Sequence, residues 1–516
     1  MGRAAARRRR RLAFSPALGF RLSGLKWDRD GRIDNTKLER KEDNRDQEAL
    51  RLRLEWTPAD EVDVALQGQA SETTVNFWPR QLMNLSDDTR AYLQAFDPQV
   101  EDDPYNFQNS YDNPGEIFKA SDTLLARAAW MPAALADWGL ETVLVAGVSK
   151  LEIDQFQDLD VSPADLLNLI DLEDYDQTSV EWRVGGTSGS LLGLGEQLEF
   201  LVGAYYFQSD FHIIADVLAG ADIASYLATD DGQRLASGGQ LPGFGIGRLG
   251  GFVPPLFSPV AGSDYYRFDY TQDTEAIALF GQLSWSLSER WLLTPGLRLN
   301  RETKRSTPTG TPVCPTAQLR CVTATMMGAE PYAPGTIERT EDNVSPKVAL
   351  SYFFDDDVSV FASWTQGYKS GGVNSVSFTG EDLEYDPEEA RSIELGLRSH
   401  WLERTLRLNA TLYRMDFDDL QVLAFNGLFF DVTNAAAAYS EGLELDVQWL
   451  TPWDVLHVDA SLGLLRARYK DYASAPAPIA EGIGAQQDLR GRTLPFAPPV
   501  SATLTPTLEI PFAWLT

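Results

Sequence analysis

The chain has 516 residues, of which 43% are hydrophobic and 11% aromatic, so it can bury apolar surface and is not a disordered chain. It has 44 Lys and Arg against 75 Asp and Glu, which gives a formal net charge of −31 at pH 7. This acidic balance argues against nucleic acid as a partner, because DNA and RNA bind basic surfaces.

The first 16 residues form a basic N-terminal stretch, "MGRAAARRRRRLAFSP", with no clear domain. Its apolar part is short and is interrupted by Ser15 and Pro16, so it matches a secretory signal peptide poorly. A basic arm for nucleic acid is the alternative interpretation, but the acidic remainder of the chain argues against it. We therefore expect one domain over residues 17–516.

From residue 17 onward, about sixteen segments alternate apolar and polar residues with a period of two, which predicts strands with one apolar and one wet face. Many segments are about ten residues long or more, whereas soluble strands cluster near five or six and a tilted membrane-spanning strand needs about 9–11. No segment has the run of about 18–20 apolar residues that a transmembrane helix needs. We predict an all-β fold, an antiparallel transmembrane β-barrel. Clear examples are residues 50–56, 62–70, 198–206, 279–287, 358–364, 393–401, 406–412, 443–449 and 456–462.

The predicted connections alternate between short and long along the chain, which is typical of a barrel with short periplasmic turns and long extracellular loops. Loops beyond about 12–15 residues are uncommon in compact soluble domains. The short connections are 57–61, 288–290, 355–357, 402–404 and 450–454. The long connections are 27–47, 73–115, 150–176, 208–271, 302–342, 369–388, 418–437 and 470–499.

In the segment 443–449, we expect the apolar set to face lipid and the polar set to face a wet lumen, because charges on a lipid face are costly. The apolar set is Leu443, Leu445, Val447 and Trp449, and the polar set is Glu444, Asp446 and Gln448. Tryptophans recur at or near predicted strand ends, where interfacial girdles of barrels lie. They are Trp56, Trp285, Trp291, Trp364, Trp401, Trp449 and Trp453.

Only two cysteines occur, Cys314 and Cys321, in the polar segment "CPTAQLRC". Their spacing predicts a local loop disulfide in an oxidising compartment, with two free thiols as the alternative. Zinc would need more ligands nearby, and the three histidines, His212, His400 and His457, are scattered. We therefore predict no metal site and no cofactor.

Two further patterns resemble binding motifs without their context. "GIGRLG", with Gly245, Gly247 and Gly250, lacks the strand before it and the helix after it that a dinucleotide fingerprint requires, so it predicts a glycine-rich loop. The acidic stretches 28–34, 101–116 and 231–233 lack the spacing of a calcium loop, so we interpret them as solvated acidic loops. No catalytic pairing suggests itself, and we predict that the chain is not an enzyme.

The long loops carry aromatic residues that could bind a bulky ligand over a barrel mouth by stacking and hydrogen bonding. The alternative is that they pack the loops against each other, so the ligand-binding residues stay unknown at this point. These aromatic residues are Phe77, Trp78, Tyr92, Phe96, Tyr105, Phe107, Tyr111, Phe425, Phe429 and Phe430.

Three segments, 343–374, 385–422 and 432–449, resemble the barrel of TonB-dependent outer-membrane receptors. The resemblance implies active uptake of a scarce nutrient across the outer membrane of a Gram-negative bacterium. Ferric siderophores are the main ligands of such receptors, besides haem, cobalamin and saccharides. The implied partners are outer-membrane lipid, a small ligand such as a ferric siderophore, and the TonB complex. The motifs that carry the resemblance are Ser345-Pro346-Lys347, Gly367-Tyr368-Lys369-Ser370-Gly371, Pro387-Glu388, Glu394-Leu395-Gly396, Asn434-Ala435 and Gly442-Leu443-Glu444, with further similarity in 30–35, 50–66 and 488–504.

The sequence also departs from that family. Nothing in it corresponds to the family's plug domain, and we count about sixteen of the 22 strands expected of a plugged barrel. The last residues, "PTLEIPFAWLT", lack the terminal strand with an aromatic end. We therefore expect a C-terminally truncated fragment of a siderophore receptor. The alternatives are a sixteen-stranded porin-like passive channel and a soluble β-rich binding or carbohydrate-active module.

Overall fold

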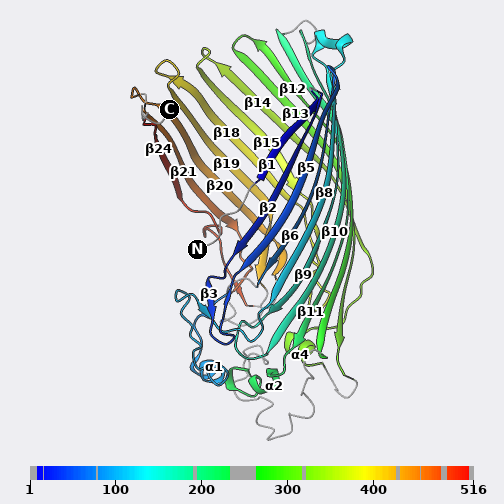
Figure 1. Cartoon of the computed structure of the whole chain (residues 1–516), viewed down its shortest axis with the longest axis vertical. Coiled ribbons are helices and arrows are strands. Elements are labelled where there is room, and N and C mark those ends of the chain that lie inside the picture. The colour runs from blue at the N-terminus through cyan, green and yellow to red at the C-terminus, as the bar shows by residue number, and fades with distance from the viewer. Residues whose placement is uncertain are drawn as a thin grey trace.

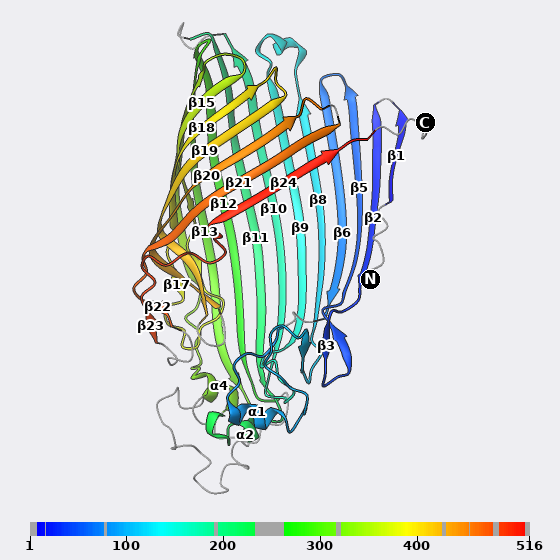
Figure 2. The same cartoon turned by 90° about the vertical axis from the view of Figure 1, so that its left-hand side faces the viewer.

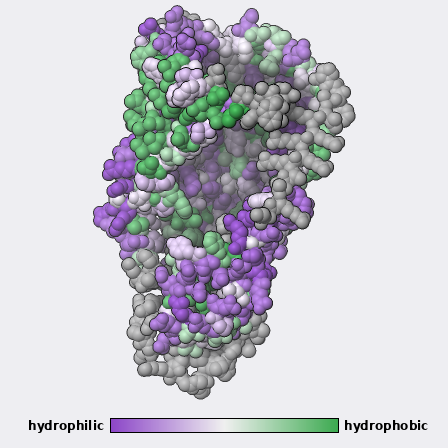
Figure 3. Space-filling view, turned by 60° about the vertical axis from the view of Figure 1, so that its left-hand side comes forward, coloured by the Kyte–Doolittle hydropathy of each residue, from purple (hydrophilic) through white to green (hydrophobic). Residues whose placement is uncertain are grey.

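The computed structural model describes residues 8–15, 17–76, 80–189, 195–232, 263–315, 321–425, 430–453, 455–477 and 485–510. These residues form one large antiparallel sheet of seventeen strands, in which each strand pairs with the next one along the wall. The sheet curls round on itself (Figures 1 and 2), and the space-filling view shows the hollow that it encloses (Figure 3). Figure 2 shows the wall open between β24 and β1, and no pairing joins these two strands among the described residues.

The strands follow each other round the wall in chain order, so every connection joins neighbours. They are β1 (Arg8–Ser15), β2 (Leu18–Arg29), β5 (Arg45–Ala59), β6 (Val62–Val75), β8 (Glu116–Trp130), β9 (Glu141–Asp158), β10 (Leu167–Ser188), β11 (Gln197–Ala219), β12 (Tyr265–Ser288), β13 (Trp291–Val313), β14 (Ile337–Phe353), β15 (Val358–Lys369), β18 (Glu388–Trp401), β19 (Leu406–Phe425), β20 (Phe430–Leu450), β21 (Leu456–Asp471) and β24 (Val500–Leu508).

Short strands and helices lie in the connections at the two rims of the wall. The strands among them are β3 (Ile33–Asn35), β4 (Arg40–Glu42), β7 (Gln108–Asn109), β16 (Gly372–Val373), β17 (Glu384–Tyr385), β22 (Ala475–Pro476) and β23 (Gln486–Gln487). The helices are α1 (Asp87–Leu93), the 3-10 helix η1 (Ala133–Trp138), α2 (Ile223–Tyr226) and α4 (Val322–Met327). Among the described residues, no helix is long and apolar enough to cross a bilayer.

The register of the strands separates two faces, because paired residues of antiparallel strands project to the same side. Leu445 lies opposite Ala410 and Leu462, while Asp446 lies opposite Asn409 and Ser461. The apolar and polar sets that the sequence predicts for segment 443–449 therefore continue on the same two faces of the neighbouring strands β19 and β21. We call the first set outward-facing and the second inward-facing.

The outward-facing side chains form an exposed apolar belt. Leu124, Leu279 and Leu395 are 55%, 57% and 55% exposed, although each is surrounded by paired strands. Figure 3 shows hydrophobic residues gathered on the upper part of the wall, whereas the end that carries the loops is mostly hydrophilic. An exposed belt of this size is typical of a surface that another apolar phase covers.

The two rims differ as the alternation of connections predicts. In Figure 1 the short turns lie at the top, and α1, α2 and α4 lie at the bottom with the long connections. Four predicted long loops are shorter in the structure because their strands continue into them. Only 159–166 separates β9 from β10, and β10 to β13 reach 22, 23, 24 and 23 residues. On β11 and β12 these extensions are apolar on the inward face, where Val217, Tyr266 and Phe268 are buried, so they pack against the connections at this rim.

The structure also adds a strand within the basic N-terminal stretch. β1 pairs with β2 from Arg8 opposite Gly24 to Ser15 opposite Leu18. The ladder of backbone hydrogen bonds requires no apolar alternation, and the sequence "RRRRLAFS" shows none. The apolar alternation in the sequence begins at residue 17, but the first strand of the structure, β1, lies before it.

Candidate functional site

The inward face near the long loops carries a row of aromatic side chains. The ring centroids of Tyr175 on β10 and Phe211 on β11 are 6.4 Å apart, and those of Phe211 and Tyr270 on β12 are 6.2 Å apart. Both contacts are edge-to-face, a favourable arrangement for aromatic pairs. Tyr270 is 3% exposed, and its hydroxyl oxygen lies 3.1 Å from the carbonyl oxygen of Val373. The row is thus covered by the connection that contains Val373.

That connection, residues 370–387, folds inward, and we call it the inner strap. It follows the end of β15, which has already left β14: the pairing of these two strands ends at Thr365 opposite Lys347, although β14 continues back to Ile337. Its two short strands, β16 and β17, pair with each other. The inner strap therefore covers the inward face of β12 to β14 instead of extending the wall.

Charged side chains of the wall hold the inner strap. Arg339 on β14 contacts Glu384 at 2.8 Å and Asp386 at 3.3 Å, besides Glu341 on its own strand at 3.3 Å. The ammonium group of Lys304 on β13 donates to the carbonyl oxygen of Gly371 at 2.7 Å. These contacts are charge-assisted, and the side chain of Arg339 is only 17% exposed, so they are screened less than surface ion pairs.

The inner strap is also held by β19 and β20. Asn374 exchanges two hydrogen bonds with the backbone of Val432, at 3.0 and 2.8 Å. Gln421 on β19 donates to the carbonyl oxygen of Ser370 at 2.9 Å, and Asn434 on β20 donates to that of Asp386 at 2.9 Å. The inner strap thus links β12–β14 to β19–β20 across the ends of the strands between them.

Two acidic side chains face inward beside the aromatic row. Burial raises the pKa of Asp171 to about 6, and the nearby Glu173 adds to the rise, while a hydrogen bond from Gln155 lowers it. One oxygen of Asp171 is buried without a hydrogen-bond partner among the described residues. Burial also raises the pKa of Glu173, although the positive charge of Lys119 opposes it. These groups add hydrogen-bonding capacity to the mouth of the hollow.

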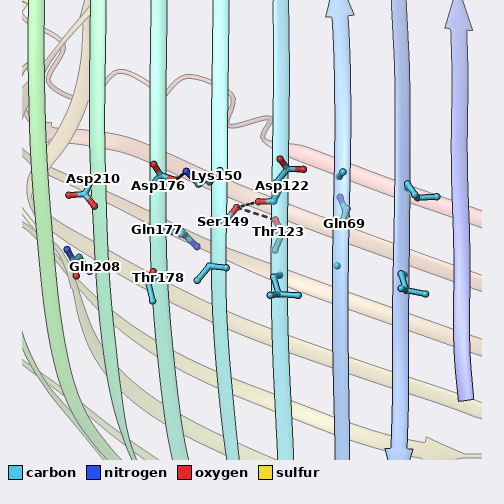
Figure 4. Close-up of a pocket in the computed structure, with 16 residues that line it drawn as sticks. Gln69, Asp122, Thr123, Ser149, Lys150, Asp176, Gln177, Thr178, Gln208 and Asp210 are labelled. Carbon is cyan, nitrogen blue, oxygen red and sulfur yellow. Dashed lines mark hydrogen bonds and ion pairs between the residues drawn. The ribbon is translucent and has the colours of Figure 1, made fainter. Parts of the chain in front are cut away.

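A separate cavity of about 710 Å³ lies on the outward face of β5 to β11 (Figure 4). The outward-facing Gly68 lies between Leu52 and Leu124 in the register, so the small residue leaves a furrow between two leucines. A polar edge that includes Lys150 and Asp176 borders it, with their charged atoms 3.1 Å apart. This furrow belongs to the apolar belt, and we do not assign the ligand to it.

The predicted loop aromatics divide between core and surface. Tyr92 and Phe96 pack with Tyr226, with ring centroids of 5.3 Å for both Tyr92–Phe96 and Tyr92–Tyr226, and Tyr111 is 0% exposed. Packing of loops against each other therefore accounts for these three. The residues that stay exposed are Tyr105 at 85%, Phe107 at 64% and Phe430 at 59%. Phe77, Trp78 and Phe429, and the glycines of "GIGRLG", lie outside the described residues, as does the side chain of Phe425.

The structure joins Cys314 and Cys321 by a disulfide, with Cα atoms 5.3 Å apart. The bridge lies beside α4, whose first residue follows Cys321. His212 contacts Asp269 at 3.0 Å, and His400 and His457 lie on other strands. Within the described parts of the chain, no three His, Cys, Asp or Glu side chains converge on a point that could hold a metal ion.

A group of buried carboxyl groups joins the β6–β8 connection to the β9–β10 connection. Asp158 is 0% exposed, and one of its oxygens has no donor among the described residues. Burial raises the pKa of Asp158, and the charges of Asp160 and Asp112 raise it further. The pKa of Asp112 is also raised by burial. The Asp112 amide donates to Ser162 at 3.1 Å, which fixes the two segments side by side.

The sequence does not reveal the inner strap, Arg339, Lys304 or Tyr270, because its pattern predicts loops over the segments in which they lie. One signal was present: "NRETKRSTPTGT" (300–311) has Thr or Ser at every second position over its second half. β-branched residues with period two indicate a strand even without apolar partners. The inward fold of the strap has no such local signal.

Comparison with protein families gives a match over most of the chain. A family model described as "TonB dependent receptor-like, beta-barrel" matches residues 153–515. Among curated proteins, the pesticin receptor of Yersinia pestis is 26% identical over 186 residues, which are 35% of this chain and 25% of that protein. The ferric-pyoverdine 358 receptor of Pseudomonas putida is 29% identical over 136 residues, 25% of this chain and 16% of that protein.

Solved structures share the fold. The ferric yersiniabactin uptake receptor FyuA from Yersinia pestis superposes with a TM-score of 0.68 at 14% identity, over 98% of this chain and 63% of that one. The siderophore receptor PiuA from Acinetobacter baumannii gives a TM-score of 0.65 at 14% identity, over 97% of this chain and 66% of that one. The chain thus spans about two thirds of their length, and at this identity the likeness shows the fold alone.

Proposed function

This chain belongs to the family of TonB-dependent receptor-like β-barrels, and we propose that it forms the barrel wall of an outer-membrane receptor for a ferric siderophore. The family consists of transport receptors, which are not enzymes. The observation that carries the proposal is an exposed apolar belt around a polar hollow whose mouth is crossed by the inner strap. A bilayer covers the belt, and the ligand enters at the strap.

The height of the belt suits a bacterial outer membrane. On β13 the outward-facing residues from Trp291 to Leu299 are followed by Arg301. Eight steps of about 3.4 Å give about 27 Å along the strand, and a tilt of about 40° reduces this to about 21 Å, close to the apolar band of about 25 Å in outer-membrane barrels.

Tryptophans mark the edge of the belt at the short-turn rim. Trp56, Trp285 and Trp449 lie near the ends of β5, β12 and β20, and Trp291 begins β13. Trp364 instead lies in the middle of β15. Trp56 and Trp291 are 49% and 42% exposed, as amphipathic rings at a membrane interface are. We assign the short-turn rim to the periplasm and the long loops to the cell exterior.

The assignment of the ligand rests on the inward site and on the relatives. Relatives whose names mention ferric pyoverdine and ferric yersiniabactin share this fold or part of the sequence. The half-buried rings of Tyr175 and Phe211 offer stacking surface to a bulky, oxygen-rich iron complex, and the Asp171–Glu173 pair offers hydrogen bonds. Energy for uptake comes from the TonB complex in the whole receptor.

The direct test is binding of radiolabelled ferric yersiniabactin and ferric pyoverdine to outer membranes that contain this chain. Replacing Arg339 by Gln removes the inner strap's contacts with Glu384 and Asp386, so we expect binding to weaken roughly tenfold. The matched control is Arg301→Gln on the outward face, whose ion pair with Asp342 is 3.6 Å long and exposed. Equal binding by both variants would remove the inner strap from the proposal. Absence of binding by the unchanged chain would remove the ligand class.

A passive channel is the competing function, and conductance separates the two. A porin-like barrel conducts ions steadily in a planar bilayer. A receptor gated by ligand and TonB does not, so long-lived open conductance from the whole receptor would favour the channel. The inner strap that crosses the mouth favours the receptor.

A further inference from the structure

One connection at the short-turn rim differs from the others. Residues 131–140 between β8 and β9 include the 3-10 helix η1, whereas only residues 289–290 separate β12 from β13. Asp137 is the only charged residue among these ten. An apolar group of side chains is exposed here, and we call it the η1 patch. It consists of Trp130 (50% exposed), Met131 (42%), Leu135 (44%) and Trp138 (54%).

The η1 helix lies against the outward face of the wall. A Cβ atom added to Gly186 on β10 would come within 3.2 Å of the carbonyl oxygen of Trp138 and 2.9 Å of the ring of Phe200. Gly186 pairs with Phe200 on β11, and both belong to the outward-facing set. The absence of a side chain at Gly186 is therefore what lets the helix end approach the wall. Figure 1 shows the light-blue coil projecting from the top of the wall.

The η1 patch continues the apolar belt. The next outward-facing residues below it, Leu144 on β9 and Trp182 on β10, are 45% and 54% exposed and pair with each other. The indole N–H groups nearby have polar partners at the rim. Trp182 donates to the hydroxyl of Thr142 at 2.9 Å, and Trp130 donates to Glu61 at 3.4 Å. Indole rings with an apolar body and a satisfied N–H suit the boundary between headgroups and acyl chains.

We propose that the β8–β9 connection is a membrane-interface anchor, in which the η1 patch inserts between the lipids of the periplasmic leaflet. This inference rests on the proposed function, because it requires the belt to face lipid. The occupant is lipid because the η1 patch is continuous with the belt and carries one charge, Asp137. A protein partner for the same patch is an outcome of the test.

The test uses single cysteines in the full chain, because Cys314 and Cys321 are joined and no free cysteine is present among the described residues. Leu135→Cys carries an environment-sensitive fluorophore in phosphatidylethanolamine–phosphatidylglycerol vesicles. Asp356→Cys, in the polar β14–β15 turn, is the control at the same rim, and Leu124→Cys is the control in the belt. Heat-modifiable gel mobility verifies that each variant is folded. If Leu135→Cys does not fold, Ala134→Cys replaces it.

We expect iodide to quench the fluorophore at position 135 roughly fivefold less than at position 356, and headgroup-labelled nitroxide lipids to quench it more than mid-chain ones. At position 124 the mid-chain nitroxides should quench most. If iodide quenches the fluorophores at positions 135 and 356 equally while position 124 stays protected, the anchor proposal is overturned. The receptor proposal then stands, and the η1 patch is left for a protein partner. Iodide access at 124 as well overturns the membrane-facing belt itself.

Discussion

Apolar side chains have different surroundings in the apolar belt and at the long-loop end of the molecule. In the belt, Leu279 lies opposite Ala204 and Leu299, its side chain points outward, and it is 57% exposed. At the long-loop end, Leu93 of α1, Ile223 of α2 and Val322 of α4 are each 2% exposed or less and pack in one cluster. The belt is a repeating pattern of exposed apolar side chains, which we propose that lipid covers, whereas the loops have a core of their own. A perturbation should therefore affect one region and spare the other.

The largest effect is expected in the belt. Leu279→Arg puts a charge on the lipid face and should lower the free energy of unfolding by about 2–4 kcal/mol. The control is Gln282→Arg, on the same strand but inward-facing, opposite Leu201 and Gly296. The measurement is equilibrium unfolding in phospholipid vesicles. Equal losses in the two variants would contradict the assignment of the faces.

The second effect is confined to the loops. Cys314 and Cys321 are seven residues apart, and their disulfide closes the loop between them. From loop-closure entropy, reducing the disulfide should lower the stability of this region by about 2.5 kcal/mol. We expect faster hydrogen exchange in α4 and unchanged exchange in β8 and β9. Peptide mapping without reductant checks that the bridge forms in cells, and two free thiols there would refute the prediction.

The sequence predicted the belt much better than the loops, for a physical reason. Period-two alternation in 443–449 is local, so it sets the two faces of β20 without knowledge of any partner. The cluster at the long-loop end brings Leu93 together with Ile223 and Val322, which are far apart in the chain. Arg339 likewise depends on carboxylates from the inner strap. No local pattern contains these partnerships.

The third effect concerns a single buried carboxylate. Asp264 is 0% exposed and accepts hydrogen bonds from the amides of Val322 at 2.7 Å and Thr323 at 3.0 Å, and from the Thr323 hydroxyl at 2.7 Å. Asp264→Ala leaves these buried donors unpaired, at a cost of about 1–3 kcal/mol. Hydrogen exchange over α4 measures the loss. Asp342→Ala, whose ion pair with Arg301 is exposed, is the control and should change stability by less than about 1 kcal/mol.

The smallest effect depends on pH, and it follows from the buried carboxyl group of Asp158. Its pKa is raised by burial first and then by the charges of Asp160 and Asp112, so the folded state binds a proton more tightly than the unfolded chain. The stability it contributes is fully present below the ordinary aspartate range and is lost as pH rises towards the raised pKa. Among the described residues, no Lys or Arg pairs with Asp112, Asp158 or Asp160 to reverse this sign.

Raising the pH by one unit near neutrality should therefore weaken the contact between the β6–β8 connection and the β9–β10 connection, by at most about 1.4 kcal/mol. The measurement is hydrogen exchange of α1 at several pH values, with each rate divided by that of an unstructured peptide at the same pH. In Asp158→Asn the side chain keeps its size but cannot ionise, so the pH dependence should weaken. Part of it should remain, because burial also raises the pKa of Asp160 to about 7 and raises that of Asp112. In Asp154→Asn, an exposed residue on the same strand, the pH dependence should stay unchanged. An unchanged pH dependence in both variants would mean that Asp158 does not control the loop contact, whereas weakening in Asp158→Asn alone would assign part of it to this buried carboxyl group.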